Sequence, residues 1–344
     1  MNPRGRTILT TALFIALGIS LVALAIGDLL VGTTNIPLSE VWAALTGGNT
    51  TEEYYTIVTT LRLPKVVVAI VAGVALSVSG LLMQTLFRNP LAGPYVLGIS
   101  SGASLGVALF TLATPLAAMW AGTSMAALGT AGMAWLGSAV VLLAVMSLSR
   151  RIKNINVILI LGMMLGSTIS AVVGILQYMG TEESLKAFVV WTMGSLSNVT
   201  LDNLYVMIPM TMVGLLFAIM VIKPLDMLLL GEGYARTMGL RVGLSRAMIF
   251  LSTTLLAGTV TAFCGPIGFI GLAMPHLARM TFRTASHRVL MPAAMLWGAT
   301  AMLLCCLVTD IVARNGVMLP VNTITSLLGI PIIIFVVLRN RNSK

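Results

Sequence analysis

The stretch LRLPKVVVAIVAGVALSVSGLLMQTLFRNPLAGPYVLGISSGAS, residues 61–104, contains the pattern that decides the fold. An apolar run follows Pro64 and continues to about Leu86. The polar turn Arg88-Asn89-Pro90-Leu91 separates it from a second apolar run, which begins near Pro94. A helix of about 20 apolar residues is long enough to cross about 30 Å of hydrocarbon. The stretch therefore predicts two membrane-spanning helices joined by a short polar turn.

The same pattern recurs along the whole chain of 344 residues, which is 58% hydrophobic and 9% charged, with a mean hydropathy of +1.02. Its 33 glycines are typical of helices that pack closely in lipid. We predict an all-α polytopic membrane protein, a single transmembrane domain over residues 1–344. The predicted ten spans are residues 8–26, 64–86, 94–112, 125–148, 157–179, 204–222, 247–263, 268–282, 289–311 and 324–338.

Two segments fall outside these spans. Residues 29–60 are polar, and residues 181–202 form an amphipathic segment that we expect to lie along the membrane surface. No A-x-A cleavage site follows the first apolar run, so we expect an anchor rather than a removed signal peptide.

The distribution of charge predicts the orientation. Cytoplasmic loops of membrane proteins carry an excess of Lys and Arg. One side of the predicted topology holds two of the ten acids, Asp226 and Glu232, and 16 of the 20 Lys and Arg: Arg4, Arg6, Arg88, Arg150, Arg151, Lys153, Lys223, Arg236, Arg241, Arg246, Arg279, Arg283, Arg288, Arg339, Arg341 and Lys344. We expect this side, and both termini, to be cytoplasmic. The net charge of +10 thus reflects topology and does not indicate a nucleic-acid partner.

The most charged segment is KPLDMLLLGEGYARTMGLRVGLSR, residues 223–246, with six charged residues in 24. Because glycine lowers helix propensity by about 1 kcal/mol relative to alanine, we expect residues 228–240 to form short helices broken at Gly231, Gly233 and Gly239. Two interpretations of this cytoplasmic segment remain open. It is either a solvated loop between two spans or a docking surface for a soluble partner.

Chemistry inside the bilayer has few candidates. The three cysteines, Cys264, Cys305 and Cys306, lie in apolar runs and are expected to be buried thiols. His276 is a candidate ligand for haem or a metal in transit, but no second ligand lies at helical spacing, which favours a hydrogen-bonded histidine near the cytoplasmic surface. The 23 methionines are scattered and are more typical of core filling than of a metal relay. The sequence has no Ser/His/Asp constellation and no GxxxxGK[ST] loop, so we predict no catalytic residues, no metal site and no cofactor.

Small residues indicate where helices approach one another. Gly98, Gly102 and Gly106 lie four apart, as do Gly162 and Gly166, which permits close backbone contact. A stripe of small and polar residues also follows one face of the span 157–179: Ser167, Ser170, Gly174 and Gln177. This stripe is either a helix-packing seam or the wall of a translocation path without fixed charge.

Four stretches together resemble FecCD-type permeases, the membrane subunits of ABC importers for iron-siderophores, haem and vitamin B12. They are residues 61–104 as quoted above, LGEGYARTMGL at 230–240, GPIGFIGLAMPHLAR at 265–279, and His287-Arg288. The resemblance implies the type II ABC importer permease fold, with ten helices and alternating access. It also implies two cytoplasmic ABC ATPase subunits, a periplasmic or lipid-anchored substrate-binding protein, and a second permease copy or paralogue in a bacterial or archaeal cytoplasmic (inner) membrane.

The resemblance also implies roles for individual residues. Asn89 and Leu91 match a loop that narrows the cytoplasmic exit, while Arg62, Lys65 and Arg314 match basic positions that face glutamates of the binding protein. Lys65 stands where arginine is usual and Gly93 where an acid is usual. The segment 230–240 matches coupling helices that sit in a cleft of the ATPase, and its candidate contact residues are Leu230, Gly231, Glu232, Ala235, Arg236, Gly239 and Leu240.

We therefore interpret the chain as a permease that moves a metal chelate or cobalamin while partner subunits hydrolyse ATP. The alternative is a stand-alone secondary transporter or channel. That class requires ion-coupling groups within the membrane, and the predicted spans contain almost none away from their ends. A membrane enzyme would lack its catalytic residues.

Overall fold

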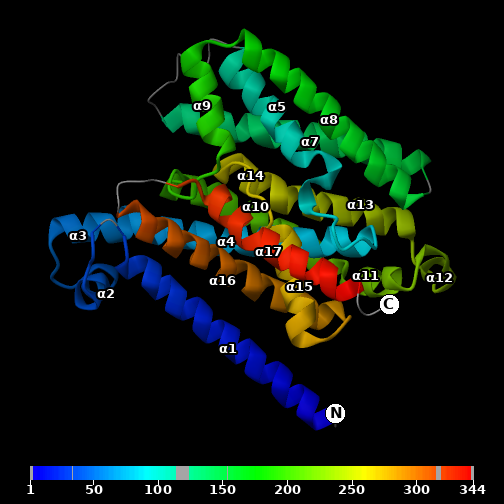
Figure 1. The fold of residues 1–344 in the computed structure, drawn as a ribbon, viewed down its shortest axis with the longest axis horizontal. Helices are drawn as coiled ribbons and strands as arrows, with labels where there is room; N and C mark the ends of the chain where they lie inside the picture. Colours follow the sequence, from blue (N-terminus) through cyan, green and yellow to red (C-terminus); the bar gives the residue numbers. More distant parts are fainter. Residues whose placement is uncertain (1–2, 33, 114–123, 153, 315–318, 342–344) are drawn as a thin grey trace. The chain divides into compact units, whose positions relative to one another are not determined.

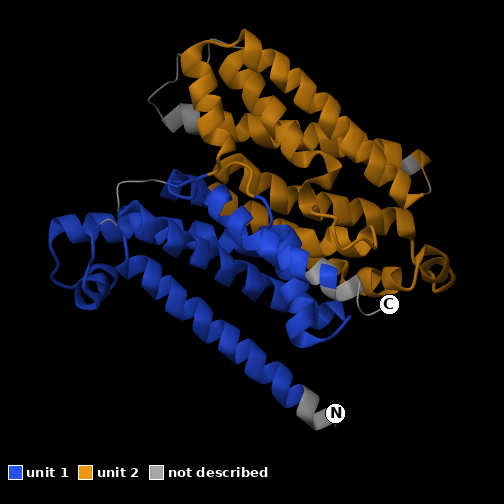
Figure 2. Ribbon diagram, in the orientation of Figure 1, with its two compact units in different colours: residues 1–77, 195–205, 268–344 blue, residues 78–194, 206–267 orange. Residues whose placement is uncertain are grey.

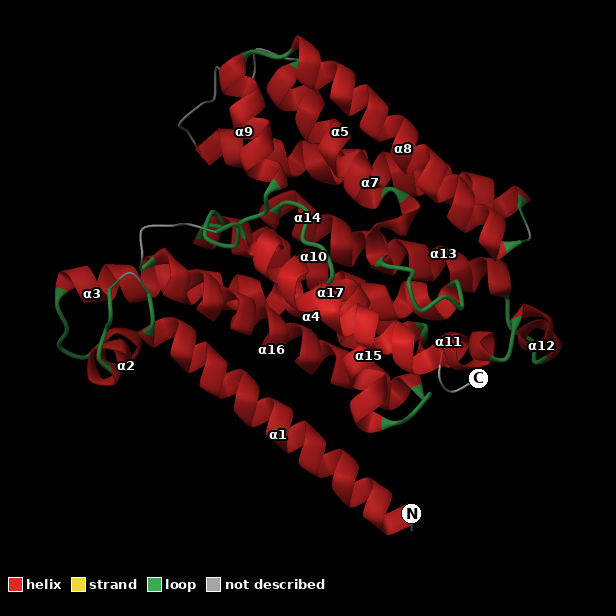
Figure 3. Ribbon diagram, in the orientation of Figure 1, coloured by secondary structure: helices red, strands yellow, loops and turns green. Residues whose placement is uncertain are grey.

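A computed structural model of the chain describes residues 3–32, 34–113, 124–152, 154–314 and 319–341. Every regular element among these residues is helical, as predicted (Figure 3). The elements, in chain order, are α1 Pro3–Leu30, α2 Leu38–Thr46, α3 Glu52–Thr56, the π-helical turn η1 Ile57–Arg62, α4 Leu63–Leu86, the 3-10 turn η2 Pro94–Leu97, α5 Ile99–Leu112, α7 Ser124–Arg151, α8 Ile155–Met179, α9 Glu182–Thr192, α10 Leu201–Met220, α11 Ile222–Leu229, α12 Glu232–Thr237, α13 Val242–Thr253, the π-helical turn η3 Thr254–Gly258, α14 Thr259–Cys264, α15 Ile270–Phe282, α16 His287–Ala313 and α17 Val321–Arg341.

All ten predicted spans fall on helices, although their lengths differ. Within the described residues, seven helices are long and apolar enough to cross a membrane: Thr7–Leu30, Glu52–Leu86, Gly129–Ser149, Ile155–Met179, Leu201–Met220, Val242–Cys264 and His287–Ala313. The other three predicted spans correspond to α5, α15 and the apolar part of α17, Val321–Phe335. With 14 residues at about 1.5 Å each, α5 is shorter than the hydrocarbon layer is thick. The chain is a multi-pass membrane protein.

The second span begins earlier than predicted. Pro64 is not its first residue, because the helix that contains it continues back through η1 and α3 to Glu52. A proline inside a helix removes one backbone donor and crowds the preceding turn. Here the wider π-turn precedes the proline, and the Leu63 amide donates to Val58 across it. The segment predicted as polar, residues 29–60, also contains the short helix α2.

The chain divides into two compact units, each assembled from separate parts of the sequence (Figure 2). Unit 1 contains residues 1–77, 195–205 and 268–344, and unit 2 contains residues 78–194 and 206–267. The prediction of one domain over residues 1–344 stays a prediction. Lys153, Lys344 and the two chain ends, which entered the predicted topology, lie outside the described residues.

Unit 1 is held together by α1, α15, α16 and α17, which pack against one another (Figure 1). The rings of Phe14 and Phe282 lie 4.6 Å apart. The Ser77 hydroxyl donates to the carbonyl of Ala294 over 2.6 Å, where α4 crosses α16. Cys305 and Cys306, on α16, are buried free thiols, and so is Cys264 of unit 2, which confirms the prediction for all three.

In unit 2, α5 packs along both α7 and α8 (Figure 1). A Cβ atom added at Gly102 would lie 2.6 Å from the carbonyl oxygen of Gly137 on α7. On the other side, a Cβ atom added at Gly162 of α8 would lie 3.0 Å from the Cα of Leu97. Backbones therefore approach as closely as the glycine spacing predicted, since no larger side chain fits at these crossings.

Large apolar side chains also cover the outer faces of several long helices. On α1, for example, Ile8, Ile15 and Ile19 are each more than half exposed. Such surfaces would be unfavourable in water but match the hydrocarbon of a bilayer. The exposed faces agree with the lengths of the helices in identifying a membrane protein.

Candidate coupling, gating and docking sites

The candidate coupling segment of unit 2 contains two short helices, α11 and α12, before the long helix that starts with α13. Gly231 separates the two with a φ of +104°, a value that residues with a Cβ rarely adopt. Gly239 ends α12 with a φ of +86°; its amide donates to Arg236 and the next amide, of Leu240, donates to Ala235. This pair of bonds is the Schellman arrangement, which favours glycine.

The expectation for Gly233 was wrong. It was predicted to break the helix, but it lies within α12, at the second position. Its φ is negative, and no atom lies within 4 Å of where its Cβ would be. Helix propensity alone was a weak guide here, because the ends of α12 are determined by the cap geometry at Gly231 and Gly239.

Three large apolar side chains project from the coupling segment. Leu230, Tyr234 and Met238 are 61%, 70% and 53% exposed. Tyr234 and Met238 lie four residues apart, on α12 and at its end, and share one side of it. Leu230 lies before the break at Gly231, so helical spacing does not align it with them. We call these three exposed side chains the apolar stripe. Ala235, also predicted in this site, is fully buried and anchors α12 to its own unit.

Glu232, at the start of α12, pairs with two arginines. Arg236 lies one turn later on the same helix, and the nitrogen–oxygen distance is 3.7 Å. The closer partner is Arg246 on α13, which donates to the same carboxylate through both Nε, over 3.0 Å, and Nη2. The sequence analysis did not single out Arg246, since no helical spacing connects it with Glu232.

The predicted exit loop follows α4 in unit 2. Asn89 accepts the Leu91 amide on its own Oδ1 over 2.9 Å, so its side chain closes the turn. The preceding residue, Arg88, has a left-handed φ of +49°. The Leu91 side chain is exposed. The turn is therefore rigid and displays Leu91, while the gating role of both residues stays a prediction.

The stripe of small and polar residues on α8 packs partly against the preceding segment of unit 2, and partly lines an open depression. Gly166 packs against Gly98, and the hydroxyl of Ser170 lies 3.5 Å from that of Ser101 on α5. Ser167 and Ser170 also line an open depression of about 620 Å³, together with Tyr95, Val96, Gly98, Ser101, Gly162, Met163 and Gly166. Gly174, one turn further, is exposed, with no atom within 4 Å of where its Cβ would be.

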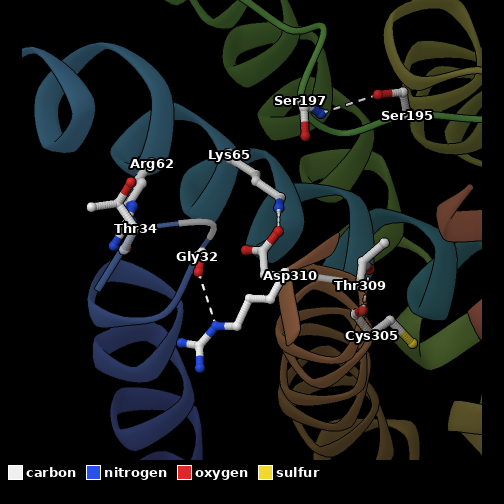
Figure 4. A network of polar contacts seen from close by, with 10 residues as sticks. Gly32, Thr34, Arg62, Lys65, Ser195, Ser197, Cys305, Thr309 and Asp310 are labelled. Atoms are coloured by element: carbon white, nitrogen blue, oxygen red, sulfur yellow. Dashed lines mark hydrogen bonds and ion pairs between the residues drawn. The ribbon is translucent and has the colours of Figure 1, made fainter. Parts of the chain in front are cut away.

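Two of the predicted docking residues lie in unit 1, Arg62 at the end of η1 and Lys65 in the first turn of α4. Arg62 is only 8% exposed and donates to the carbonyls of Leu29, over 2.7 Å, and of Thr34 (Figure 4). Lys65, one turn later, forms an ion pair with Asp310 of α16 (Figure 4). Both side chains therefore already have partners within this chain.

Arg314, the third predicted docking residue, follows the end of α16. It donates to the Gly32 carbonyl over 3.0 Å and to the side chain of Asn35, and it is exposed. Arg62 and Arg314 thus both donate to the segment at and after the end of α1, whereas Lys65 pairs with Asp310. The resemblance implied only that the three bases share one side of the membrane. Their contacts with a binding protein stay a prediction.

The sequence analysis also missed the acids beside these bases. Asp310 pairs with Lys65, and Asp28, near the end of α1, is 3% exposed, with no hydrogen-bond partner for either carboxylate oxygen among the described residues. The signal was present in the sequence. Asp28 and Asp310 each occupy the outer end of an apolar run.

His276 lies within α15 and is buried. Among the described residues, no group of three or more His, Cys, Asp or Glu side chains is arranged to hold a metal ion. The role of His276 as a ligand in transit therefore gains no support from such a group.

Comparisons with known proteins give the same assignment as the motifs. The sequence model of the FecCD transport family matches residues 19–339. The chain is 37% identical to the hemin transport system permease protein HmuU of Yersinia pestis, over 95% of each chain. It is 35% identical to the vitamin B12 import system permease protein BtuC of Klebsiella pneumoniae, over 82% of each.

A solved structure assigned to the metal-chelate type of ABC transporter, in an inward-facing conformation, shares the fold. It superimposes with a TM-score of 0.81 at 29% identity and covers 96% of this chain and 99% of its own. Sequence and fold thus agree over nearly the whole length, and the chain belongs to the FecCD transport family.

Proposed function

We propose that this permease subunit of an ABC importer carries a bulky metal chelate, of the haem class or the related corrinoid class. The observation that carries the proposal is the match to the hemin permease HmuU over 95% of both chains, at 37% identity. The match to BtuC covers less of the chain, which places vitamin B12 second. Iron-siderophores are the third class to test.

The energy would come from partners. We infer that two ABC ATPases bind the coupling segment and that a second permease copy or a paralogue completes the path. The apolar stripe supports this inference, because exposed apolar side chains within a charged segment are typical of protein interaction sites. ATP-driven movement of α12 would then open and close the path.

The substrate path itself would use polar but uncharged surface. Ser167 and Ser170 line the depression on α8, and Gly174 leaves the neighbouring surface open. Asn89 holds the turn that would present Leu91 at the cytoplasmic exit. A wall of hydroxyl groups and small residues suits a large cargo, because fixed charge would trap it.

The opposite side would receive a periplasmic or lipid-anchored binding protein. Arg314 is the strongest candidate contact, since it is exposed. Arg62 and Lys65 would support the surface through their bonds to Thr34 and Asp310. This assignment places both termini in the cytoplasm of a single-domain permease and needs no resident cofactor and no nucleic acid.

Transport by the reconstituted complex tests the proposal. Proteoliposomes that contain the permease, its ATPase and ATP, with binding protein outside, should accumulate haem, whereas the permease alone should accumulate none. Cyanocobalamin and a ferric siderophore are offered in parallel to identify the cargo class. Uptake driven by an ion gradient without the ATPase would instead establish a secondary transporter.

A single substitution tests the coupling role separately. Gly239→Val places a β-branched residue at φ +86°, where side chains are strained, yet no neighbouring atom blocks it. We expect the variant to insert and assemble, while ATP hydrolysis no longer responds to the loaded binding protein. Full stimulation would make residues 223–246 a solvated loop.

A further inference from the structure

The guanidinium of Arg246 connects three elements of unit 2. The residue belongs to α13 and is 4% exposed. Its Nε and Nη2 donate to Oε1 of Glu232 on α12, and its Nη1 donates to the carbonyl of Ile152, directly after α7, over 3.4 Å. One buried side chain therefore links the short helix of the coupling segment to two long helices.

Apolar packing does not fill the space around this link. A cavity of about 490 Å³ lies beside it, and its lining includes Ile152 at the end of α7, Arg236 of α12, and Arg246 and Phe250 of α13. Where side chains are not in contact, dispersion forces transmit little. The ion pair between Arg246 and Glu232 is a direct connection between α13 and α12 beside this cavity.

The geometry of the pair suits a mechanical connection. A guanidinium offers a rigid, planar set of donors, so two of them on one carboxylate oxygen restrict orientation as well as distance. Because Arg246 is buried, water competes poorly for its charge. Such a pair resists separation and rotation, whereas the exposed pair between Glu232 and Arg236 has only weak and screened attraction.

We propose that Arg246 is a positioning residue that fixes α12 to α13 and to the end of α7, so that movement of α12 is passed to these long helices. The proposal rests on the proposed coupling role of residues 230–240. It adds the path by which the movement leaves the short helix: through Glu232 into Arg246, then along α13 and through the Ile152 carbonyl.

The test uses the complete complex in proteoliposomes of phosphatidylethanolamine and phosphatidylglycerol. ATP hydrolysis is measured with and without binding protein, loaded with whichever of haem and cyanocobalamin the wild type transports. Arg246→Gln should lower the ratio of stimulated to unstimulated rate about tenfold, within the usual range of coupling factors. Arg246→Lys keeps the positive charge but loses the two parallel donors of the guanidinium, so it should lower the stimulation ratio less.

A spectroscopic measurement separates positioning from stability. Spin labels at Thr237 and Leu244, both exposed, report the distance between α12 and α13 after the three buried cysteines are replaced by alanine. The distribution should be narrow in the wild type, broad in Arg246→Gln and intermediate in Arg246→Lys. A general loss of stability would not produce this graded order.

Three further variants complete the test. Glu232→Gln leaves Arg246 charged, buried and without this partner, so the double variant Glu232→Gln/Arg246→Gln should fold better than Glu232→Gln but couple no better than Arg246→Gln. Arg151→Gln removes an exposed arginine next to Ile152 and is the matched control, with a stimulation ratio within about twofold of the wild type.

The outcomes distinguish this proposal from the proposed function. If Gly239→Val loses stimulation while Arg246→Gln keeps both stimulation and a narrow distance distribution, the coupling role stands and the Arg246 connection is overturned. If the wild-type complex shows no stimulation and no uptake of any chelate, the proposed function fails first.

Discussion

Two charged regions of the molecule differ in how their charged side chains are paired and in what they leave exposed. At the proposed docking residues of unit 1, Arg62 and Lys65 are already paired with carbonyls and with Asp310 of the same chain. At the coupling segment of unit 2, Glu232 is tied to Arg246, but the apolar stripe beside it remains exposed. The charges of the first region are paired within the folded chain, whereas the second leaves apolar surface exposed in the folded chain.

The difference shows that charge content does not identify a docking surface by itself. Both regions are rich in charge by sequence, and both match motifs implied by the family. What separates them is the partner of each side chain. Buried pairs contribute to the fold, while exposed apolar residues on a short, capped helix are available for association. Four predictions test this contrast, in order of decreasing expected change in free energy.

The largest effect is expected at the ion pair of unit 1. Asp310→Ala leaves Lys65 charged and mostly buried, which should destabilise the protein by about 3 kcal/mol. Thermal unfolding of the purified permease in detergent measures the shift. Lys65→Met/Asp310→Leu should recover most of the loss, because it removes both charges. Equal melting temperatures for Asp310→Ala and the wild type would show that the pair does not stabilise unit 1.

The apolar stripe should affect coupling rather than stability. Tyr234→Asp/Met238→Asp places two carboxylates on the exposed face of the coupling segment, where burial against an ATPase would be costly. We expect ATPase affinity to fall at least about tenfold, or about 1.4 kcal/mol, with an unchanged melting temperature. Thr237→Asp, on the same helix but outside the stripe, is the control. Unchanged affinity in the double variant would remove the stripe from the interface.

The third effect concerns the binding protein. Arg314 is exposed, so Arg314→Glu should weaken docking about fivefold, by about 1 kcal/mol, and the loss should shrink as salt screens the interface. Arg62→Gln should instead lower stability, since its buried donors serve two carbonyls. Binding of the loaded protein to nanodiscs measures both. The reverse ranking of the two variants would contradict the assignment of Arg314 as the contact.

The smallest effect is expected for the exposed ion pair between Glu232 and Arg236. Arg236→Ala removes a pair with a separation of 3.7 Å on a solvent-facing turn, so stability should change by only about 0.3–0.5 kcal/mol. Thermal unfolding in low and high salt checks this, and the small difference should vanish in high salt. A loss as large as that of Asp310→Ala would show that Arg236 has a buried partner in the folded protein.

The class of protein and most of its helices could be predicted from the sequence. Runs of about 20 apolar residues determine spans without reference to neighbours, because the bilayer is as apolar as a protein core. Glycine spacing on residues 98–106 and 162–166 likewise predicted close helix contacts, since the absence of a side chain is a local property. The glycines at 231 and 239 predicted the limits of the short helix α12, and the resemblance implied a coupling role for residues 230–240, which stays a prediction.

Pairing required the tertiary structure. Glu232 and Arg246 are 14 residues apart, with a helix end and a turn between them, and Lys65 and Asp310 are 245 apart, so no periodicity connects either pair. The start of the second span was missed for a related reason. The local sequence around Pro64 predicts a helix boundary, but the π-turn before the proline allows the helix to continue back to Glu52. Apolar runs and glycine spacing depend on the residue itself, whereas the partner of a buried charge depends on which helices the fold brings together.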